Sequence, residues 1–141
     1  MSFNLDQFLP YRLSVAASQV SRRFAARYET EAGLTIPEWR VLAHLNKSGP
    51  VSVRDINARV NLDKSMVSRA AMRLEQAGYL RKSTHDTDLR LVVLELTENG
   101  RELMKRLGVI AEAFQEELLA ELGGDAPILR RALEAMIRQT E

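Results

Sequence analysis

Short hydroxyl and cationic side chains share one face of a predicted helix that begins at residue 64. Lys64, Ser65, Ser68 and Arg69 lie on this face together with Met72, and no carboxylate interrupts it. Such side chains can hydrogen-bond the edges of nucleic-acid bases and the oxygens of phosphates. A face that meets only water usually mixes its charges, so the pattern favours nucleic-acid contact. For any single residue, an ordinary solvated surface remains the alternative.

More cations surround this helix in the sequence. Between residues 54 and 90 the chain carries eight basic and five acidic residues, whereas residues 112–121 include four glutamates and no basic residue. This asymmetry of charge makes the middle of the chain the candidate for an anionic partner. The candidate DNA contacts are Arg54, Lys64, Ser65, Ser68, Arg69, Arg73, Arg81, Lys82, Asp88 and Arg90.

Two short helices joined by a tight turn are expected to position this face. Ser52 is suited to cap a helix that ends near residue 60, and Asp63 is suited to cap the next helix, residues 64–77. In a helix-turn-helix unit the second helix lies in the major groove of double-stranded DNA, and residues near its N-terminus reach the bases. The helix from residue 64 therefore has the place of a recognition helix.

A β-hairpin is predicted after this helix, because the pattern changes to strand-like segments at residues 79–84 and 90–96. Arg90 at its base can reach phosphates or the minor groove, whose negative potential is enhanced in A·T-rich DNA. Asp88 can hold the Arg90 guanidinium by charge-assisted hydrogen bonds. A surface ion pair that only braces the hairpin is the alternative.

Long amphipathic helices are expected on both sides of this central segment. Apolar residues recur at three- and four-residue spacing over residues 9–28 and 103–122, and Thr35 and Glu38 form a capping-box pattern. The stripes offer more apolar surface than one thin lobe covers, so we expect a homodimer. The expected fold is mainly α (α+β): a single domain over 1–141, with a winged helix-turn-helix lobe at 35–97 and dimerisation helices at 5–32 and 98–141.

The composition is that of a soluble globular protein, with 45% hydrophobic and 28% charged residues, and excludes several classes of function. The 141 residues include no cysteine and two histidines, so we expect no disulfide, no metal site and no cofactor. No segment resembles a membrane span or a secretory signal, which favours the cytoplasm. An enzyme is not expected, because the chain lacks a nucleophile elbow and a glycine-rich phosphate loop, and His85 falls at a hairpin tip.

Several of these segments resemble the multiple antibiotic resistance regulator (MarR) family. The resemblance covers essentially the whole chain. Its most specific part is the hairpin aspartate and arginine followed by the pattern leucine-threonine-x-x-glycine. The segments that carry it are residues 37–42, 62–69, 74–80, 88–90 and 96–100. The resemblance implies a winged-helix homodimer in which the first and last helices interleave. It also implies a regulator, usually a repressor, since many members of the family release DNA when a small aromatic or anionic ligand binds between the two lobes. A two-fold dimer presents two recognition helices, so we expect a near-palindromic operator.

The resemblance also suggests where such an effector would bind. A cation beside an aromatic ring suits an aromatic carboxylate, and the start of the second helix is similar to the branch that senses hydroxycinnamates or their thioesters. The candidates are Arg12, Arg22, Trp39, Arg40 and His44, although Trp39 and His44 also fit a packed core. The absence of cysteine excludes the thiol-oxidation branch of the family. A ligand-independent architectural DNA-binding protein is the alternative function.

Overall fold

The computed structural model describes residues 2–84, 87 and 91–138. The chain divides into two compact units, Met1–Leu107 and Gly108–Glu141, and each is considered by itself. Within the described residues, no helix has the length and apolar character that crossing a membrane would need.

The first unit begins with the short 3-10 helix η1 (Leu5–Gln7) and the long helix α1 (Leu9–Ala32). Gly33 ends α1 with a φ of 67°, and its N–H donates to the Glu29 carbonyl. The long amphipathic helix expected from the stripe over residues 9–28 is thereby confirmed. The expected inward stripe is only partly buried: Tyr28 is buried, whereas Leu9 and Leu13 are exposed within this chain.

Helix α2 (Ile36–Ser48) starts with the predicted capping box. The Thr35 hydroxyl accepts from the Glu38 N–H at 3.3 Å, and the Thr35 N–H donates to the Glu38 carboxylate at 3.4 Å. After Gly49 the chain forms the two-residue strand β1 (Val51–Ser52) and the short helix α3 (Val53–Arg59). Ser52 caps α3 as expected, since its hydroxyl accepts from the Asp55 N–H at 3.1 Å.

A tight turn leads from α3 to helix α4 (Lys64–Gln76). Asn61 has a φ of 56° and is the one non-glycine residue with positive φ in the described chain. The Asp63 carboxylate accepts from the Met66 N–H at 2.9 Å and so caps α4. Gly78, with a φ of 86°, turns the chain out of the helix. The helix, the turn and the second helix match the predicted helix-turn-helix.

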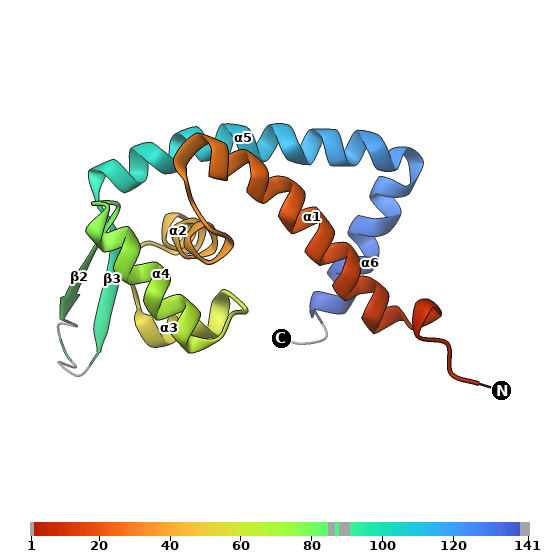
Figure 1. Cartoon of the computed structure of the whole chain (residues 1–141), viewed down its shortest axis with the longest axis horizontal. Helices are drawn as coiled ribbons and strands as arrows, with labels where there is room; N and C mark the ends of the chain where they lie inside the picture. Colours follow the sequence, from red (N-terminus) through yellow and green to blue (C-terminus); the bar gives the residue numbers. More distant parts are fainter. Residues whose placement is uncertain (1, 85–86, 88–90, 139–141) are drawn as a thin grey trace. The chain divides into compact units, whose positions relative to one another are not determined.

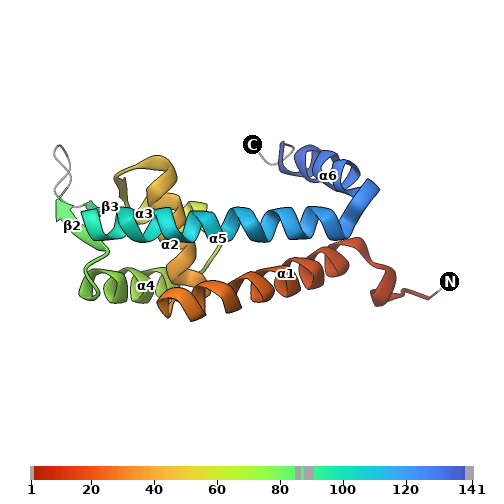
Figure 2. The same ribbon diagram turned by 90° about the horizontal axis from the view of Figure 1, so that it is seen from above.

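Strands β2 (Leu80–Thr84) and β3 (Val92–Leu96) form the expected antiparallel hairpin, with Leu80 opposite Leu96 and Arg81 opposite Glu95. The sheet has the order β1-β3-β2, and β1 adds Val51 opposite Leu94. Figures 1 and 2 both show the hairpin beside α3 and α4 at one end of the first unit. The sequence analysis missed β1, because two residues are too few to show an alternating pattern.

Helix α5 (Glu98–Leu122) begins against the end of α4. The Thr97 hydroxyl donates to the Gly78 carbonyl at 2.6 Å and accepts from the Gly100 N–H at 3.1 Å. A Cβ on Gly100 would overlap the Tyr79 carbonyl oxygen, so this position requires glycine. The threonine and glycine of the leucine-threonine-x-x-glycine pattern therefore hold the start of α5 close to the end of α4.

The core of the first unit lies among α2, α3, α4, the sheet and the start of α5. Its fully buried side chains include Val41, Leu42, Leu45, Ile56, Val67, Leu74, Leu94, Leu103 and Leu107. In the second unit, the 3-10 helix η2 (Gly123–Asp125) leads into helix α6 (Ala126–Arg138). Helix α6 has no buried residue in the single chain, and Ile128, Leu129, Leu133, Met136 and Ile137 are exposed.

Candidate nucleic-acid interface

The start of α4 is held by one carboxylate. Besides the Met66 N–H, the Asp63 carboxylate accepts from the Ser65 hydroxyl at 2.7 Å. The Met66 and Ser65 hydrogen bonds, with the nearby Arg69 guanidinium, hold the pKa of the Asp63 carboxyl below its ordinary value. Asp63 therefore stays ionised and fixes both the first turn of α4 and the direction of the Ser65 hydroxyl.

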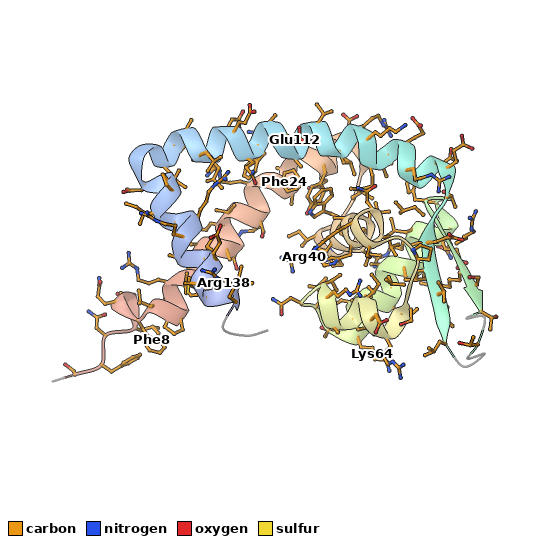
Figure 3. The ribbon with its side chains drawn as sticks, turned by 180° about the vertical axis from the view of Figure 1, so that it is seen from behind. Phe8, Phe24, Arg40, Lys64, Glu112 and Arg138 are labelled. Atoms are coloured by element: carbon orange, nitrogen blue, oxygen red, sulfur yellow. The ribbon has the colours of Figure 1, made fainter. Side chains whose placement is uncertain are left out.

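The buried and the exposed residues of α4 lie on opposite faces of the helix, as predicted. Its buried face consists of Val67, Ala70, Ala71 and Leu74, and it packs on α2 and α3. The opposite face exposes Lys64, Ser65, Ser68, Arg69, Met72 and Arg73. Glu75 is the first carboxylate along α4. The first turns of α4 thus present hydroxyls and cations to the outside, and Figure 3 shows Lys64 on the outer side of this lobe.

Three of the candidate DNA-binding cations are held by carboxylates of the same lobe. Arg73 lies 3.5 Å from the Glu38 carboxylate, Arg81 donates to Glu95 at 2.8 Å, and Lys82 lies 3.7 Å from Glu75. Arg54, Lys64 and Arg69 form no ion pair within the part of the chain that the structure describes. These three are therefore the cations with the fewest competing contacts.

The Glu38–Arg73 contact is the functional link that sequence reasoning missed. The side chain of Glu38 is only 8% exposed, because it also closes the capping box of α2. Arg73 thus ties the recognition helix to the start of α2. The two residues are 35 positions apart, so no local pattern pairs them.

Cations from three elements meet at a groove between the helix-turn-helix and the hairpin. Arg54 of α3, Lys64 of α4 and Lys82 of β2 line a space of about 450 Å³. Asn57 also lines it, and its Oδ1 atom is the buried side-chain oxygen left without a hydrogen-bond partner in the described residues. The groove gathers three of the predicted DNA contacts, although they are far apart in the sequence.

Two predicted DNA contacts belong to the wing segment between β2 and β3. Asp88 and Arg90 lie outside the described residues, as does His85. The bases of both wing strands are described, and the cross-strand pair of Arg81 and Glu95 joins them.

A second cavity gathers part of the candidate effector set. Arg22 of α1 and Arg40 of α2 line a space of about 480 Å³ together with Ser14, Ser18, Ser21, Ile36 and Asn61. Arg40 extends from the side of α2 remote from the sheet (Figure 3). Neither guanidinium has an ion-pair partner in the described chain. Two unpaired cations beside serine hydroxyls make this space suitable for an anion. The serines and Asn61 were not predicted.

The other effector candidates do not line this cavity. Trp39 stacks on Tyr28 with ring centroids 5.6 Å apart, and Phe24 meets Trp39 edge-on at 5.0 Å. Burial in this cluster raises the pKa of the Tyr28 hydroxyl to about 12. His44 is half-buried, and burial, with Lys47 and Arg59 nearby, lowers its pKa. Arg12 is exposed on α1.

The sequence is similar to known regulators. A model of the MarR family matches residues 34–92. The uncharacterized HTH-type transcriptional regulator YdgJ of Bacillus subtilis (strain 168) is 26% identical over 106 residues, which are 75% of this chain and 65% of YdgJ. The chain thus matches less than two thirds of the length of that relative.

Solved structures share the fold over nearly the full chain. A MarR/EmrR family transcriptional regulator from Acinetobacter sp. ADP1 matches with a TM-score of 0.83 and 26% identity, covering 98% of this chain and 97% of that one. BpsR of Bordetella bronchiseptica, whose DNA binding is regulated by 6-hydroxynicotinic acid, matches with a TM-score of 0.81 and 24% identity over 99% and 97% of the two chains. The mainly helical architecture and the three-stranded antiparallel sheet are those of winged-helix regulators. Residues 34–92 are thus similar to the MarR family of DNA-binding transcriptional regulators, and nearly the full chain shares the fold of a solved MarR/EmrR family regulator.

Proposed function

We propose that the chain binds a near-palindromic DNA operator as a homodimer, and that it represses transcription until a small aromatic or anionic effector releases it. The observation that carries the proposal is the outer face of α4. From Lys64 to Arg73 this face bears hydroxyls and cations, it contains no carboxylate, and its position is fixed by the Asp63 cap and by the Glu38–Arg73 contact.

Base recognition falls to the first turns of α4. A recognition helix reaches base edges with its N-terminal residues, and in this chain those are Ser65, Ser68 and Arg69. Arg69 forms no ion pair in the described residues and interacts with Asp63 only at longer range, so its guanidinium is available for the bidentate contact that arginine makes with guanine. Ser65 already donates its proton to Asp63 and is left as a hydrogen-bond acceptor.

Phosphate contacts fall to the groove beside α4. Arg54, Lys64 and Lys82 can neutralise neighbouring phosphates of one strand, because all three line the same space. In the proposal, Arg90 extends this contact from the wing, with Asp88 as its orienting partner. Phosphate contacts position a protein on DNA without reading the sequence.

Dimerisation falls to the terminal segments. Residues 3–15 expose Phe3, Leu5, Phe8, Leu9, Tyr11, Leu13 and Val15, and α6 exposes five more apolar side chains. Monomeric soluble proteins rarely leave apolar helix faces of this kind in water. A two-fold dimer would present two recognition helices about one helical turn of DNA, ~34 Å, apart.

Effector binding falls to the cavity lined by Arg22 and Arg40. Two unpaired guanidinium groups favour a carboxylate, and the serine hydroxyls can hydrogen-bond further polar groups of a ligand such as an aromatic acid or a thioester. BpsR, which has the same fold, is regulated by an aromatic acid. That likeness supports the class of effector rather than its identity.

The test starts with binding. The full chain should select a near-palindromic sequence from a random duplex library, protect two half-sites in a footprint, and bind more weakly as salt rises, through release of counterions. Sedimentation at micromolar concentration should give twice 15.9 kDa. Protection of a single half-site, or a folded monomer, would contradict the proposal.

Repression and release need a second experiment. In transcription in vitro from a promoter that carries the selected site, the protein should lower transcript yield, and aromatic carboxylates such as 6-hydroxynicotinic acid should be screened for restoring it. If no member of a panel of aromatic acids and coenzyme A thioesters shifts the melting temperature or the DNA affinity, the architectural DNA-binding alternative is favoured.

A further inference from the structure

One line of residues on α4 points directly away from the core. An α-helix turns by about 100° per residue, so the direction opposite the buried face is fixed by Val67, Ala70, Ala71 and Leu74. Residues 65, 69, 72 and 76 lie within about 30° of that outward direction. All four are exposed, and their order along the helix is serine, arginine, methionine and glutamine.

Met72 is unusual among the apolar residues of this unit. Between residues 16 and 108, the described large apolar side chains that are exposed are Met72, at 46%, and Val92, at 44%. The others belong to residues 3–15 and 109–137. A single apolar side chain in water means little by itself. Met72, however, stands between Arg69 and Gln76 on the line that would face the floor of a DNA groove.

The contacts of the residues around Met72 indicate which side chains of this line remain available to a partner. Arg73, the next residue, is held at 3.5 Å by Glu38, and the Ser65 hydroxyl donates to Asp63. Arg69 and Gln76 make no hydrogen bond or ion pair with the described part of the chain. The outward line therefore presents two polar side chains that lack partners and, between them, one flexible apolar side chain.

The major groove offers one apolar group to such a side chain. Thymine carries a C5-methyl group there, and the other base edges present only hydrogen-bond donors and acceptors. Methionine is polarizable and unbranched, so it adapts to a small apolar partner. Resting on the proposed function, we propose that Met72 determines specificity by packing on the methyl group of a thymine, next to the base pair that Arg69 reads.

The experiment removes the methyl group rather than the base. Each thymine of the operator selected by the full chain is replaced in turn by deoxyuridine, which keeps every hydrogen bond. At one position in each half-site, binding should weaken roughly fourfold, the effect expected for one buried methyl group. Met72→Ala should bind the thymine and uracil operators equally at that position. Met72→Leu, which keeps an apolar side chain, should retain part of the preference.

Two controls keep the outcomes distinct. Val92→Ala, which removes the other exposed large apolar side chain of this unit but lies on β3 and not on α4, should keep the full thymine preference. Because Met72 is exposed, its variants should melt at the temperature of the parent. A Met72→Ala protein that keeps the thymine preference, or an operator with no methyl-sensitive position, would overturn the assignment while leaving the proposed function intact. A chain that selects no DNA would overturn both.

Discussion

The winged-helix lobe (residues 35–97) and the terminal segments (residues 3–15 and 109–137) treat their apolar residues in opposite ways. In the lobe, the described large apolar side chains are buried or half-buried within one chain, except for the exposed Met72 and Val92. In the terminal segments, thirteen large apolar side chains are exposed, and α6 buries none of its described residues.

This difference indicates which part of the molecule covers its apolar side chains without a second chain. The lobe satisfies its caps, its sheet and its core with its own residues, so its binding face can be described from one chain. The terminal segments carry the apolar stripe of a helical core without the surface that would cover it. A second copy of the chain supplies such a surface in the proposed function.

The largest expected effect comes from a charge in the terminal segments. Leu133→Glu should abolish dimerisation, because each of two copies loses a leucine contact worth about 1.5–3 kcal/mol and gains a charge to bury. Operator binding should then weaken roughly hundredfold or more, since each half-site is held separately. Sedimentation and operator titration measure the two effects.

A matched control lies on the same helix. Arg131 is two residues from Leu133 and so points to the opposite side of α6. Arg131→Glu introduces the same carboxylate and should leave the protein dimeric. If Leu133→Glu remains a dimer with full operator affinity, the exposed stripe of α6 is not the interface, and the contrast between the two regions needs another explanation.

The second expected effect is a difference between two arginines of the winged-helix lobe, Arg69 and Arg73. Arg69→Ala should cost about 1–3 kcal/mol of operator affinity and relax the preference at one base pair, because an unpaired guanidinium reads guanine. Arg73→Ala should instead lower the melting temperature, since it leaves the buried Glu38 carboxylate without its cation. Melting curves and a second library selection measure both variants. Equal relaxation of base preference by the two would show that the ion pair does not withhold Arg73 from DNA.

The same lobe shows how far local sequence determines structure. The capping box at Thr35, the Ser52 and Asp63 caps and the Gly78 stop were all predictable, because each depends on contacts within about four residues. The inner and outer faces of α4 followed from its periodicity. From these local patterns, the helix-turn-helix and most residues of the outer face of α4 could be predicted.

The features that the sequence did not predict depend on contacts between residues far apart in the chain, or on a surface that the single chain does not provide. The contacts of Arg73 with Glu38 and of Arg81 with Glu95 cross 35 and 14 positions, so these two of the proposed DNA-contacting cations could not be recognised as ion-paired. Asn61 reaches the effector cavity because the turn folds back on α1 and α2. The sequence also could not predict which residues of the α1 stripe, such as Leu9 and Leu13, stay exposed in one chain, because the stripe does not indicate which surface covers it.

The third effect is a loss of effector response. Arg22→Ala and Arg40→Ala should each weaken binding of an aromatic carboxylate about tenfold, because each removes one charge-assisted contact. Thermal shifts with 6-hydroxynicotinic acid and related acids measure this. Arg12→Ala is the matched control, since Arg12 is also a cation of α1 but does not line the cavity. A response lost in Arg12→Ala and kept in Arg40→Ala would move the effector site away from this cavity.

The smallest effect concerns pH, and it belongs to the lobe because both histidines of the chain, His44 and His85, fall within it. Burial, and then Lys47 and Arg59, lower the pKa of His44 in the folded protein. Just below an ordinary histidine pKa of about 6.5, the unfolded chain therefore binds more protons than the folded one. The contribution of His44 to stability is complete above that pH and is lost as the pH falls through the folded pKa. The melting temperature should accordingly decrease slightly as the pH falls from about 7 to about 5.5, and His44→Gln should reduce this decrease. A pH dependence that persists in full in His44→Gln would show that His44 does not cause it.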